Sequence, residues 1–313
     1  MKKYLCIDGG GTYIKHAVID ENEQFLARGR TPTLMKTAEG VVDVIEQIYR
    51  TYEDISGIAM SFPGLIDVET GYMHTGGSLQ FLDNTDLANM VSDRCDGVPV
   101  TLENDAKAAA SAELYSGALR NSQNGMVITI GTALGGTLII ERKIVRGSNL
   151  FAGEISYMYY SDEHMFDQPP ANKFFSEACK KTFWALRCGP TRICDEYNLR
   201  SGEHIDVRES EQIFKRAASG DELAIRAITA AAKDFAMLLT NLQCMFDPEI
   251  IAVGGGISEQ PMFFSTVQNE LDVFFERCLP GLPKVTLVPC RYRVDANLLG
   301  AYYFHKERES VRV

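Results

Sequence analysis

The chain lacks a long apolar run and an excess of basic charge. None of its hydrophobic stretches reaches the ~18 residues expected of a membrane-spanning helix, and its start, Met1–Tyr4, leads into a strand with no secretory signal pattern. The formal net charge is −11, whereas nucleic acids and anionic membranes are usually met by clustered Lys and Arg. We therefore expect neither a nucleic-acid nor a membrane partner.

The sequence also lacks the paired cysteine spacing of a disulfide-rich domain. Its eight cysteines are scattered through apolar or helical contexts, which is typical of reduced thiols and indicates a cytoplasmic protein. Cys179, Cys188 and Cys194 are conceivable metal ligands, but their wide spacing favours ordinary buried or surface cysteines.

Two common nucleotide-binding fingerprints are absent as well. No stretch matches Gly-x4-Gly-Lys-[Ser/Thr], and no Gly-x-Gly-x-x-Gly is followed by the expected acid. Low-complexity tracts are missing too. The composition, 45% hydrophobic and 23% charged, is that of a globular protein, and a length of 313 residues is enough for two domains of ordinary size.

The chain does contain a glycine-tipped hairpin at its start, in the stretch Leu5–Val18. Two apolar, strand-like runs flank Gly9, Gly10 and Gly11, and such a tip leaves backbone N–H groups free to cradle a phosphate. Beside it, Thr12 offers a hydroxyl and Asp8 a carboxylate for a magnesium ion. Lys15 could assist the phosphates, or it could be a solvated strand lysine.

A second copy of this pattern occupies residues 126–140. Met126–Ile130 is followed by a glycine–threonine tip and by the apolar run Leu138–Ile140. The residues of this tip that we expect at a nucleotide are Gly131, Thr132, Gly135 and Gly136. An internal repeat of strand, tip and strand indicates two related halves that hold one nucleotide.

A third glycine cluster, Gly254, Gly255 and Gly256, follows the apolar strand 250–253. Ligands of open α/β sheets bind at the carboxyl ends of strands, and a helix expected from about Ser258 would place this cluster at a helix start, where it could seat adenosine and ribose. Any one cluster alone could be merely a tight turn; three in this order favour a nucleotide site.

Strands and helices alternate along the chain, which predicts an α/β fold. The expected strands are 4–7, 13–19, 58–62, 98–102, 126–130, 138–140, 250–253 and 285–288, and the expected helices are 38–52, 86–93, 106–119, 173–186, 210–218, 221–246, 258 onward and 296–305. We place the domain boundary near residues 119–124, where polar residues precede the second hairpin.

Asp105 is the expected catalytic residue. It lies where a strand meets an alanine-rich helix, so it is held rigidly, and a carboxylate there can accept the proton of a hydroxyl that attacks a phosphate. The alternative is that Asp105 only caps the helix.

In this order the motifs resemble those of ROK-family sugar kinases, which belong to the actin-like, hexokinase-type ATPase superfamily. The matching motifs, which cover nearly the whole chain, are Asp8-Gly-Gly-Gly-Thr12, Pro63-Gly64, Glu103-Asn-Asp-Ala106, Gly131-Thr132 with Gly135-Gly136, Ala152-Gly-Glu154 and Gly254-Gly-Gly256.

The resemblance implies two actin-like (ribonuclease H-like) domains with a nucleotide- and sugar-binding cleft between them. They would span residues 1–119, with a C-terminal helix of about 296–313 packed on this first domain, and 120–295. It also implies ATP-dependent phosphorylation of a sugar hydroxyl, expected to be the 6-hydroxyl, with magnesium, and commonly a homodimer.

The same resemblance implies the sugar-binding residues. Asn104 would hold sugar hydroxyls together with Asp105, and Glu154 would accept hydrogen bonds from others, unless it is a surface residue in a turn. Family members commonly continue into Ile-Gly-His and a cysteine-rich zinc segment, but here Tyr157 stands in place of the histidine and residues 158–173 contain no cysteine. We therefore expect no structural zinc, and Tyr157 would contact the sugar. Glu177 is a loosely aligned candidate for a second sugar-binding glutamate.

Zinc-free relatives of this kind include β-glucoside kinases and some N-acetylmannosamine kinases. The stretch Gly76–Asp83 with Ala-Gly-Glu-Ile-Ser-Tyr157 looks most like the β-glucoside kinase branch. The backbone at Gly76 and Gly77 would approach the sugar closely, and Gly77 and Ser78 are the expected sugar-binding residues of this loop. Alternatives are a loop without ligand contact, a glucokinase or N-acetylmannosamine kinase, and a sugar-sensing regulator without turnover.

Overall fold

The computed structural model describes residues 1–131, 133–161, 181–293 and 295–311. The chain forms two compact units. Unit 1 comprises residues 1–120, 146–152 and 294–313, and unit 2 comprises residues 121–145 and 153–293. None of the described helices is long and apolar enough to cross a membrane.

Unit 1 is built on a five-stranded sheet with the strand order β3-β2-β1-β4-β7. Its elements are β1 (Lys3–Gly9), β2 (Tyr13–Asp20), β3 (Phe25–Pro32), α1 (Ala38–Tyr49), β4 (Ile55–Phe62), β5 (Ile66–Asp67), β6 (Tyr72–Met73), the 3-10 turn η1 (Gln80–Leu82), α2 (Leu87–Arg94), β7 (Val100–Asn104), α3 (Asp105–Tyr115) and α9 (Ala296–Val311). β1, β2 and β3 pair antiparallel, while β1, β4 and β7 run parallel.

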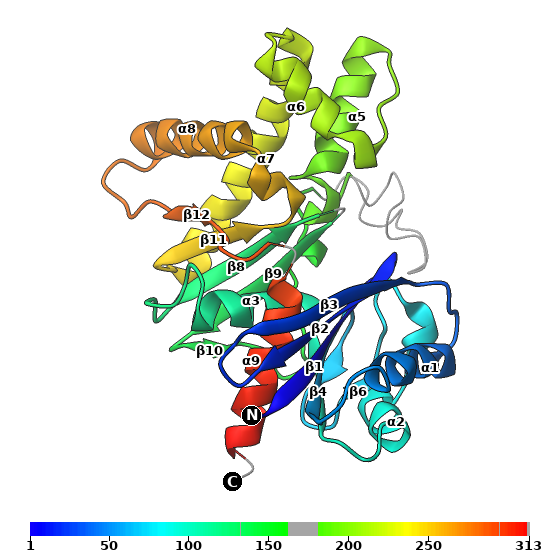
Figure 1. Ribbon diagram of the computed structural model, residues 1–313. Helices are drawn as coiled ribbons and strands as arrows, with labels where there is room; N and C mark the ends of the chain where they lie inside the picture. The colour runs from blue at the N-terminus through cyan, green and yellow to red at the C-terminus, as the bar shows by residue number, and fades with distance from the viewer. Residues whose placement is uncertain (132, 162–180, 294, 312–313) are drawn as a thin grey trace. The chain divides into compact units, whose positions relative to one another are not determined.

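Helices cover both faces of this sheet (Figure 1). On one face, the apolar stripe of α1, which includes Val41 and Ile45, packs on buried strand residues such as Ile7 and Ile58. On the other face, α9 packs on α3 and on β1, β4 and β7. The two helices approach so closely that a Cβ at Gly300 would lie 1.7 Å from the carbonyl oxygen of Ala108.

Unit 2 repeats the sheet with the strand order β10-β9-β8-β11-β12. Its elements are β8 (Gly125–Ile130), β9 (Leu134–Ile140), β10 (Lys143–Ile144), η2 (Ile155–Tyr157), η5 (Trp184–Leu186), α5 (Pro190–Ser201), η6 (Val207–Glu209), α6 (Glu211–Ala218), α7 (Glu222–Phe246), β11 (Ile250–Gly254), η7 (Gly256–Glu259), α8 (Pro261–Cys278) and β12 (Leu287–Pro289). Again the first three strands pair antiparallel and the remaining ones parallel.

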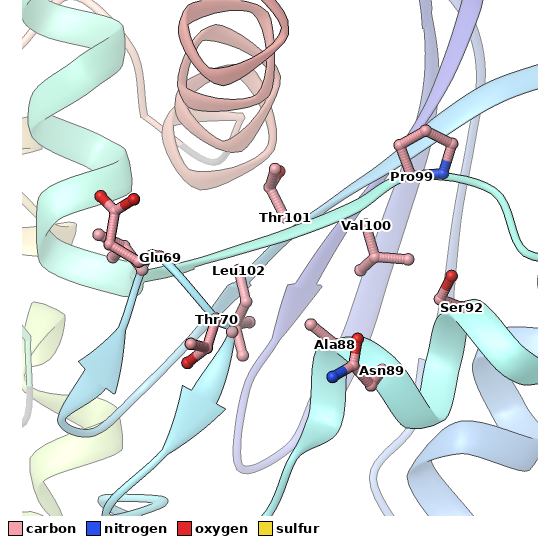
Figure 2. Close-up of a pocket in the computed structure, with 11 residues that line it drawn as sticks. Glu69, Thr70, Ala88, Asn89, Ser92, Pro99, Val100, Thr101 and Leu102 are labelled. Atoms are coloured by element: carbon pink, nitrogen blue, oxygen red, sulfur yellow. The ribbon is translucent and has the colours of Figure 1, made fainter. Parts of the chain in front are cut away.

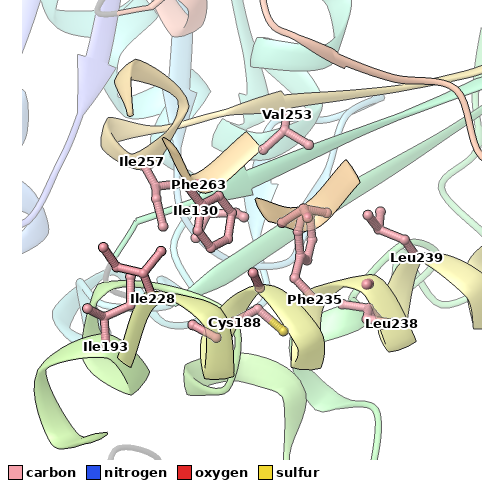
Figure 3. Packing of buried hydrophobic residues seen from close by; sticks show 14 of the residues in the cluster. Ile130, Cys188, Ile193, Ile228, Phe235, Leu238, Leu239, Val253, Ile257 and Phe263 are labelled. Atoms are coloured by element: carbon pink, nitrogen blue, oxygen red, sulfur yellow. The ribbon is translucent and has the colours of Figure 1, made fainter. Parts of the chain in front are cut away.

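The long helix α7 centres the core of unit 2. Asp221 caps it by accepting from the N–H groups of Leu223 and Ala224, and Asp247, in the left-handed region with φ 43°, ends it. Phe235 of α7 stacks on Phe263 of α8 with ring centroids 6.0 Å apart, and the same cluster contains strand residues of the sheet (Figure 3).

The structure confirms the predicted α/β class and adjusts several elements. It adds β3 and α5, which we did not predict. The expected helix 173–186 lies partly outside the described residues, and its described end is only the 3-10 turn η5. The helix expected from Ser258 begins at Pro261, after the 3-10 turn η7.

Candidate functional site

The first glycine tip is a backbone turn that is stabilised by two hydrogen bonds at Gly10. The N–H of Gly10 donates to the carbonyl of Tyr13 at 3.0 Å, and the Thr33 hydroxyl donates to the carbonyl of Gly10 at 2.7 Å. Gly11 and Thr12 at its end are exposed. An exposed turn with a fixed backbone and no side chain at Gly11 suits a phosphate cradle.

Asp8 lies at the end of β1 beside this tip and is only 6% exposed. One carboxylate oxygen accepts from the Asn297 amide at 2.9 Å and the other from the Lys15 ammonium at 3.2 Å. Each oxygen keeps a lone pair for a further partner, and carboxylate oxygen is a preferred magnesium ligand. The residues therefore fit the predicted ion. We did not predict Asn297, because this contact joins residues 289 apart in sequence.

The catalytic candidate lies where β7 meets α3. The helix is capped by Asn104, whose side-chain oxygen accepts from the N–H of Lys107 at 3.2 Å. The alternative that Asp105 is merely the cap is therefore wrong. Asp105 is the first residue of α3 and half-buried, and its Oδ1 accepts from the N–H of Ala106 at 2.8 Å.

The loops around this junction bring the predicted sugar-binding residues of unit 1 together. The Asn104 amide donates to the carbonyl of Gly64 at 3.0 Å. Gly77 has φ +58°, and a Cβ there would lie 3.1 Å from the backbone nitrogen of Gly64. The Ser78 hydroxyl oxygen lies 3.9 Å from the position of a Cβ at Gly11. Thus the first glycine tip, the 77–78 loop and the end of β7 lie close together within unit 1.

The second glycine tip joins β8 and β9 in unit 2. The N–H of Gly131 donates to the carbonyl of Ala133 at 3.1 Å, and Gly135 and Gly136 pair across the ladder with Thr129 and Ile128. Gly131 is exposed, so the turn offers bare backbone. Thr132 lies outside the described residues.

The third glycine cluster packs on the end of β8. Gly255 has φ +88°, and a Cβ there would lie 2.3 Å from the carbonyl oxygen of Ile130, so only glycine fits. Gly254 ends β11, whereas a Cβ at Gly256 would meet nothing within 4 Å. The second and third clusters therefore lie side by side in unit 2, and Gly256 leaves space for a ligand.

Glu154 and Tyr157 lie beside the second tip. A Cβ at Gly136 would be 2.5 Å from the carbonyl oxygen of Gly153, so the chain before Glu154 packs directly on β9. Burial, and secondly the charge of Glu154, raise the pKa of Tyr157. Glu154 is half-buried and Tyr157 is 47% exposed, which leaves both side chains accessible to a ligand.

The structure describes only some of the residues named in the metal-site predictions. Cys188 and Cys194 are buried in the apolar core of unit 2, as ordinary core cysteines are, while Cys179 lies outside the described part of the chain. Over the described ranges no three His, Cys, Asp or Glu side chains gather as a metal site requires. Because residues 162–180 are not described, the expected lack of structural zinc stays a prediction, as does the role of Glu177.

Two features of unit 1 were not predicted. One is a fully buried carboxylate, Glu103, which pairs with Arg146. The other is a cavity of ≈ 320 Å³ between the β5–β6 hairpin, α2 and the outer edge of β7, lined by Glu69, Asn89 and Val100 among others (Figure 2). None of the predicted site residues lines this cavity.

The protein belongs to the ROK family, whose pattern matches residues 4–308. A similar protein is the "Beta-glucoside kinase" of Klebsiella pneumoniae, which is 29% identical over 305 residues, covering 96% of this chain and 95% of that protein. The family and carbohydrate-kinase class predicted from the motifs are thus confirmed.

Solved structures agree with this assignment. A ROK family protein from Streptococcus pneumoniae TIGR4, solved in complex with sucrose, has a TM-score of 0.84 and 27% identity, covering 98% of this chain and 99% of the other. A ROK family glucokinase from Streptomyces griseus, solved with glucose and AMPPNP, has a TM-score of 0.77 and 24% identity, with 96% and 97% covered. They confirm the predicted actin-like, hexokinase-type fold.

Proposed function

We propose that this protein is an ATP-dependent sugar kinase in which Asp105 accepts the proton of the attacked hydroxyl. The observation that supports this most is the junction of β7 and α3, where Asn104, rather than Asp105, caps the helix and where the Asn104 amide bonds the carbonyl of Gly64, against which the 77–78 loop packs. Phosphoryl transfer depends on positioning and charge stabilisation, and a rigidly held carboxylate supplies the acceptor for the proton.

The nucleotide is assigned to the three glycine clusters. In unit 1 the tip residues Gly10, Gly11 and Thr12, with Lys15, would hold phosphate, and Asp8 would hold magnesium. In unit 2 we assign Gly131, Thr132, Gly135, Gly136 and Gly254–Gly256 to the same nucleotide. Bound magnesium–ATP supplies the phosphoryl group, and backbone N–H groups at such turns bind its oxygens without a net positive charge on the protein.

The sugar is assigned to Gly77, Ser78, Asn104 and Asp105 in unit 1 and to Glu154 and Tyr157 in unit 2. Relatives named β-glucoside kinase favour a β-glucoside as substrate, and relatives named glucokinase or N-acetylmannosamine kinase make glucose and N-acetylmannosamine the alternatives. We further propose that the protein is cytoplasmic and forms a homodimer. Light scattering of the purified protein tests the dimer, and fractionation of cells tests the location.

The test is ADP release with a panel of sugars: cellobiose, an aryl β-glucoside, glucose, N-acetylglucosamine and N-acetylmannosamine. We expect the highest kcat/KM with a β-glucoside. A preference for glucose or N-acetylmannosamine would assign the protein to the corresponding alternative, and no turnover with any sugar would favour a sensor.

The catalytic assignment has its own test. Asp105→Ala should lower kcat by at least about 100-fold, since general-base catalysis contributes about 10²–10⁴, and leave nucleotide binding and the unfolding midpoint nearly unchanged. The matched control is Asp86→Asn, a carboxylate of unit 1 that accepts from the nearby Asn89 amide at 2.9 Å, and it should keep wild-type kcat. Asp105→Ala with more than a few per cent of activity would contradict the assignment.

A further inference from the structure

Glu103 occupies an unusual place for a carboxylate. It lies on β7, the edge strand of the unit 1 sheet, directly before Asn104, and is 0% exposed. One of its oxygens accepts from the backbone N–H of Asn104 at 2.8 Å, and the other accepts from the guanidinium of Arg146. Burial raises the pKa of Glu103, and the charges of Arg146 and Lys107 oppose that rise.

The Glu103 carboxylate provides a hydrogen-bond acceptor for the backbone at the end of β7. In the parallel ladder Asn104 pairs with Phe62 on β4, and among the described residues β7 is the edge strand of this sheet. Glu103 supplies the acceptor for the N–H of Asn104, so its carboxylate sets the orientation of the peptide that leads to Asn104 and Asp105. Through Glu103, Arg146 is therefore linked by hydrogen bonds to the junction that carries Asp105.

Arg146 also begins a short segment, residues 146–152, which we name the strap. The N–H of Ala152 donates back to the carbonyl of Arg146 at 3.0 Å and closes it. Leu150 in the strap has φ +60°, a left-handed conformation that is strained for leucine and persists only where its surroundings enforce it. Leu150 lines a cavity of ≈ 10 Å³ together with Glu103 and Asn104, so the strap is fixed against the same junction.

In the chain, the strap runs from Arg146, which pairs with Glu103, to the residue before Gly153 and Glu154. Its last residue, Ala152, is followed by Gly153 and Glu154, and the latter is a proposed sugar ligand. Arg146 is held further by the ring of Phe304, whose centroid lies 5.5 Å from the guanidinium carbon.

A buried ion pair contributes little net stability, because desolvation offsets the attraction, and apolar replacements of both partners are often tolerated. We propose that Arg146 and Glu103 are instead positioning residues of the sugar kinase: their ion pair orients the Asn104–Asp105 junction and anchors the strap for sugar phosphorylation. This inference rests on the proposed function.

The experiment compares Arg146→Met, Arg146→Lys and the double variant Glu103→Gln/Arg146→Met with wild type. For each we would measure kcat, the KM of the sugar, the KM of ATP and the thermal unfolding midpoint. Arg146→Met should lower kcat/KM for the sugar at least 30-fold while the KM of ATP stays within twofold. Arg146→Lys should recover part of this loss, because it keeps the charge but not the guanidinium geometry.

The double variant separates positioning from stability. It leaves no unpaired buried carboxylate, so its unfolding midpoint should return toward that of wild type, while kcat/KM for the sugar stays at least 30-fold low. Activity that recovers together with the midpoint would overturn the proposal, as would Arg146→Met within threefold of wild type. The double variant also keeps the test valid if Arg146→Met fails to fold.

The matched control is Arg308→Met, which removes another unit 1 ion pair, that between Arg308 and Glu69. It should retain the wild-type kcat and sugar KM; losses equal to those of Arg146→Met would overturn the proposal. A wild-type protein that turns over no sugar of the panel would overturn the proposed function and this inference with it, whereas an active wild type with unaffected variants would overturn only the inference.

Discussion

The hairpin tips of the two units share a scaffold and differ in charge. In unit 1, the pair next to the end of the β1–β2 ladder is Asp8 opposite Lys15. In unit 2, the pair at the same place in the β8–β9 ladder is Thr129 opposite Gly135. Both tips expose backbone, at Gly11 and at Gly131, but only the first adds a carboxylate suited to a cation.

The difference shows how a repeated fold can carry different side-chain chemistry at equivalent turns. Backbone amides come with the turn geometry itself and are present in both units. The charged pair Asp8 and Lys15 occurs in the unit 1 ladder, where the amide of Asn297 from α9 also donates to Asp8. We therefore expect substitutions at equivalent ladder positions to have very unequal effects.

The largest difference in kcat/KM should come from substitutions at the two equivalent ladder positions, Asp8 and Thr129. Asp8→Asn should lower kcat/KM for ATP about 100-fold and raise the magnesium concentration required, because loss of a group at a metal site costs about that much. Thr129→Val in unit 2 should change kcat/KM by less than about fivefold, since a single neutral hydrogen bond contributes about 1 kcal/mol. Steady-state kinetics over a magnesium titration measures both. Equal losses would mean that the two tips do not differ as described.

The next largest difference should be between the unfolding free energies of two neighbouring glycine variants of unit 2, at Gly255 and Gly256. Gly255→Ala should lower the free energy of unfolding by about 2 kcal/mol or more, because the positive φ and the contact with the carbonyl of Ile130 are both unfavourable for alanine. Gly256→Ala should leave stability unchanged and raise the KM of ATP.

The measurement is urea unfolding followed by tryptophan fluorescence. The single tryptophan, Trp184, is 2% exposed and belongs to unit 2, so it reports on that unit. If Gly255→Ala were as stable as Gly256→Ala, the close packing of the third cluster on β8 would be incorrect.

The smallest effect concerns the pH response of unit 1. Hydrogen bonds from Lys2, first, and from Lys306 lower the pKa of Glu309 to about 2. A lowered carboxyl pKa contributes stability that is present above the unfolded value and lost as the pH falls toward 2. Glu309→Gln should therefore cost about 0.5–1 kcal/mol at pH 7, as partly exposed ion pairs do.

The difference between Glu309→Gln and wild type should shrink as the pH falls from 4.5 toward 2, measured by urea unfolding with circular dichroism. Glu307→Gln, an exposed residue of the same helix, should match wild type throughout. A difference that is independent of pH would assign the effect to packing rather than charge.

Local patterns explain what the sequence could predict. The glycine tips, the flanking apolar runs and the polar junction at Asn104–Asp105 are each encoded within a few adjacent residues, so both hairpins and the start of α3 were predictable. β3 was missed because alternate residues face solvent and include Arg28 and Arg30. α5 was missed because it is polar and begins at Pro190.

Contacts between distant segments could not be predicted. Asn297 meets Asp8, and Arg146 meets Glu103, only because α9 and the strap fold back on the first sheet. No spacing within either segment indicates its partner. The candidate ligand-binding residues were therefore predictable, while the residues that hold them in place were not.

The position of α9 in the chain has a consequence for biosynthesis. β1, β4 and β7 are translated before unit 2, whereas residues 296–311, which cover one face of their sheet, are translated after it. Until α9 is made, that face of the nascent chain stays exposed to solvent. Folding of the unit 1 sheet should therefore wait for α9, and chaperones have an apolar surface to bind while unit 2 is synthesised.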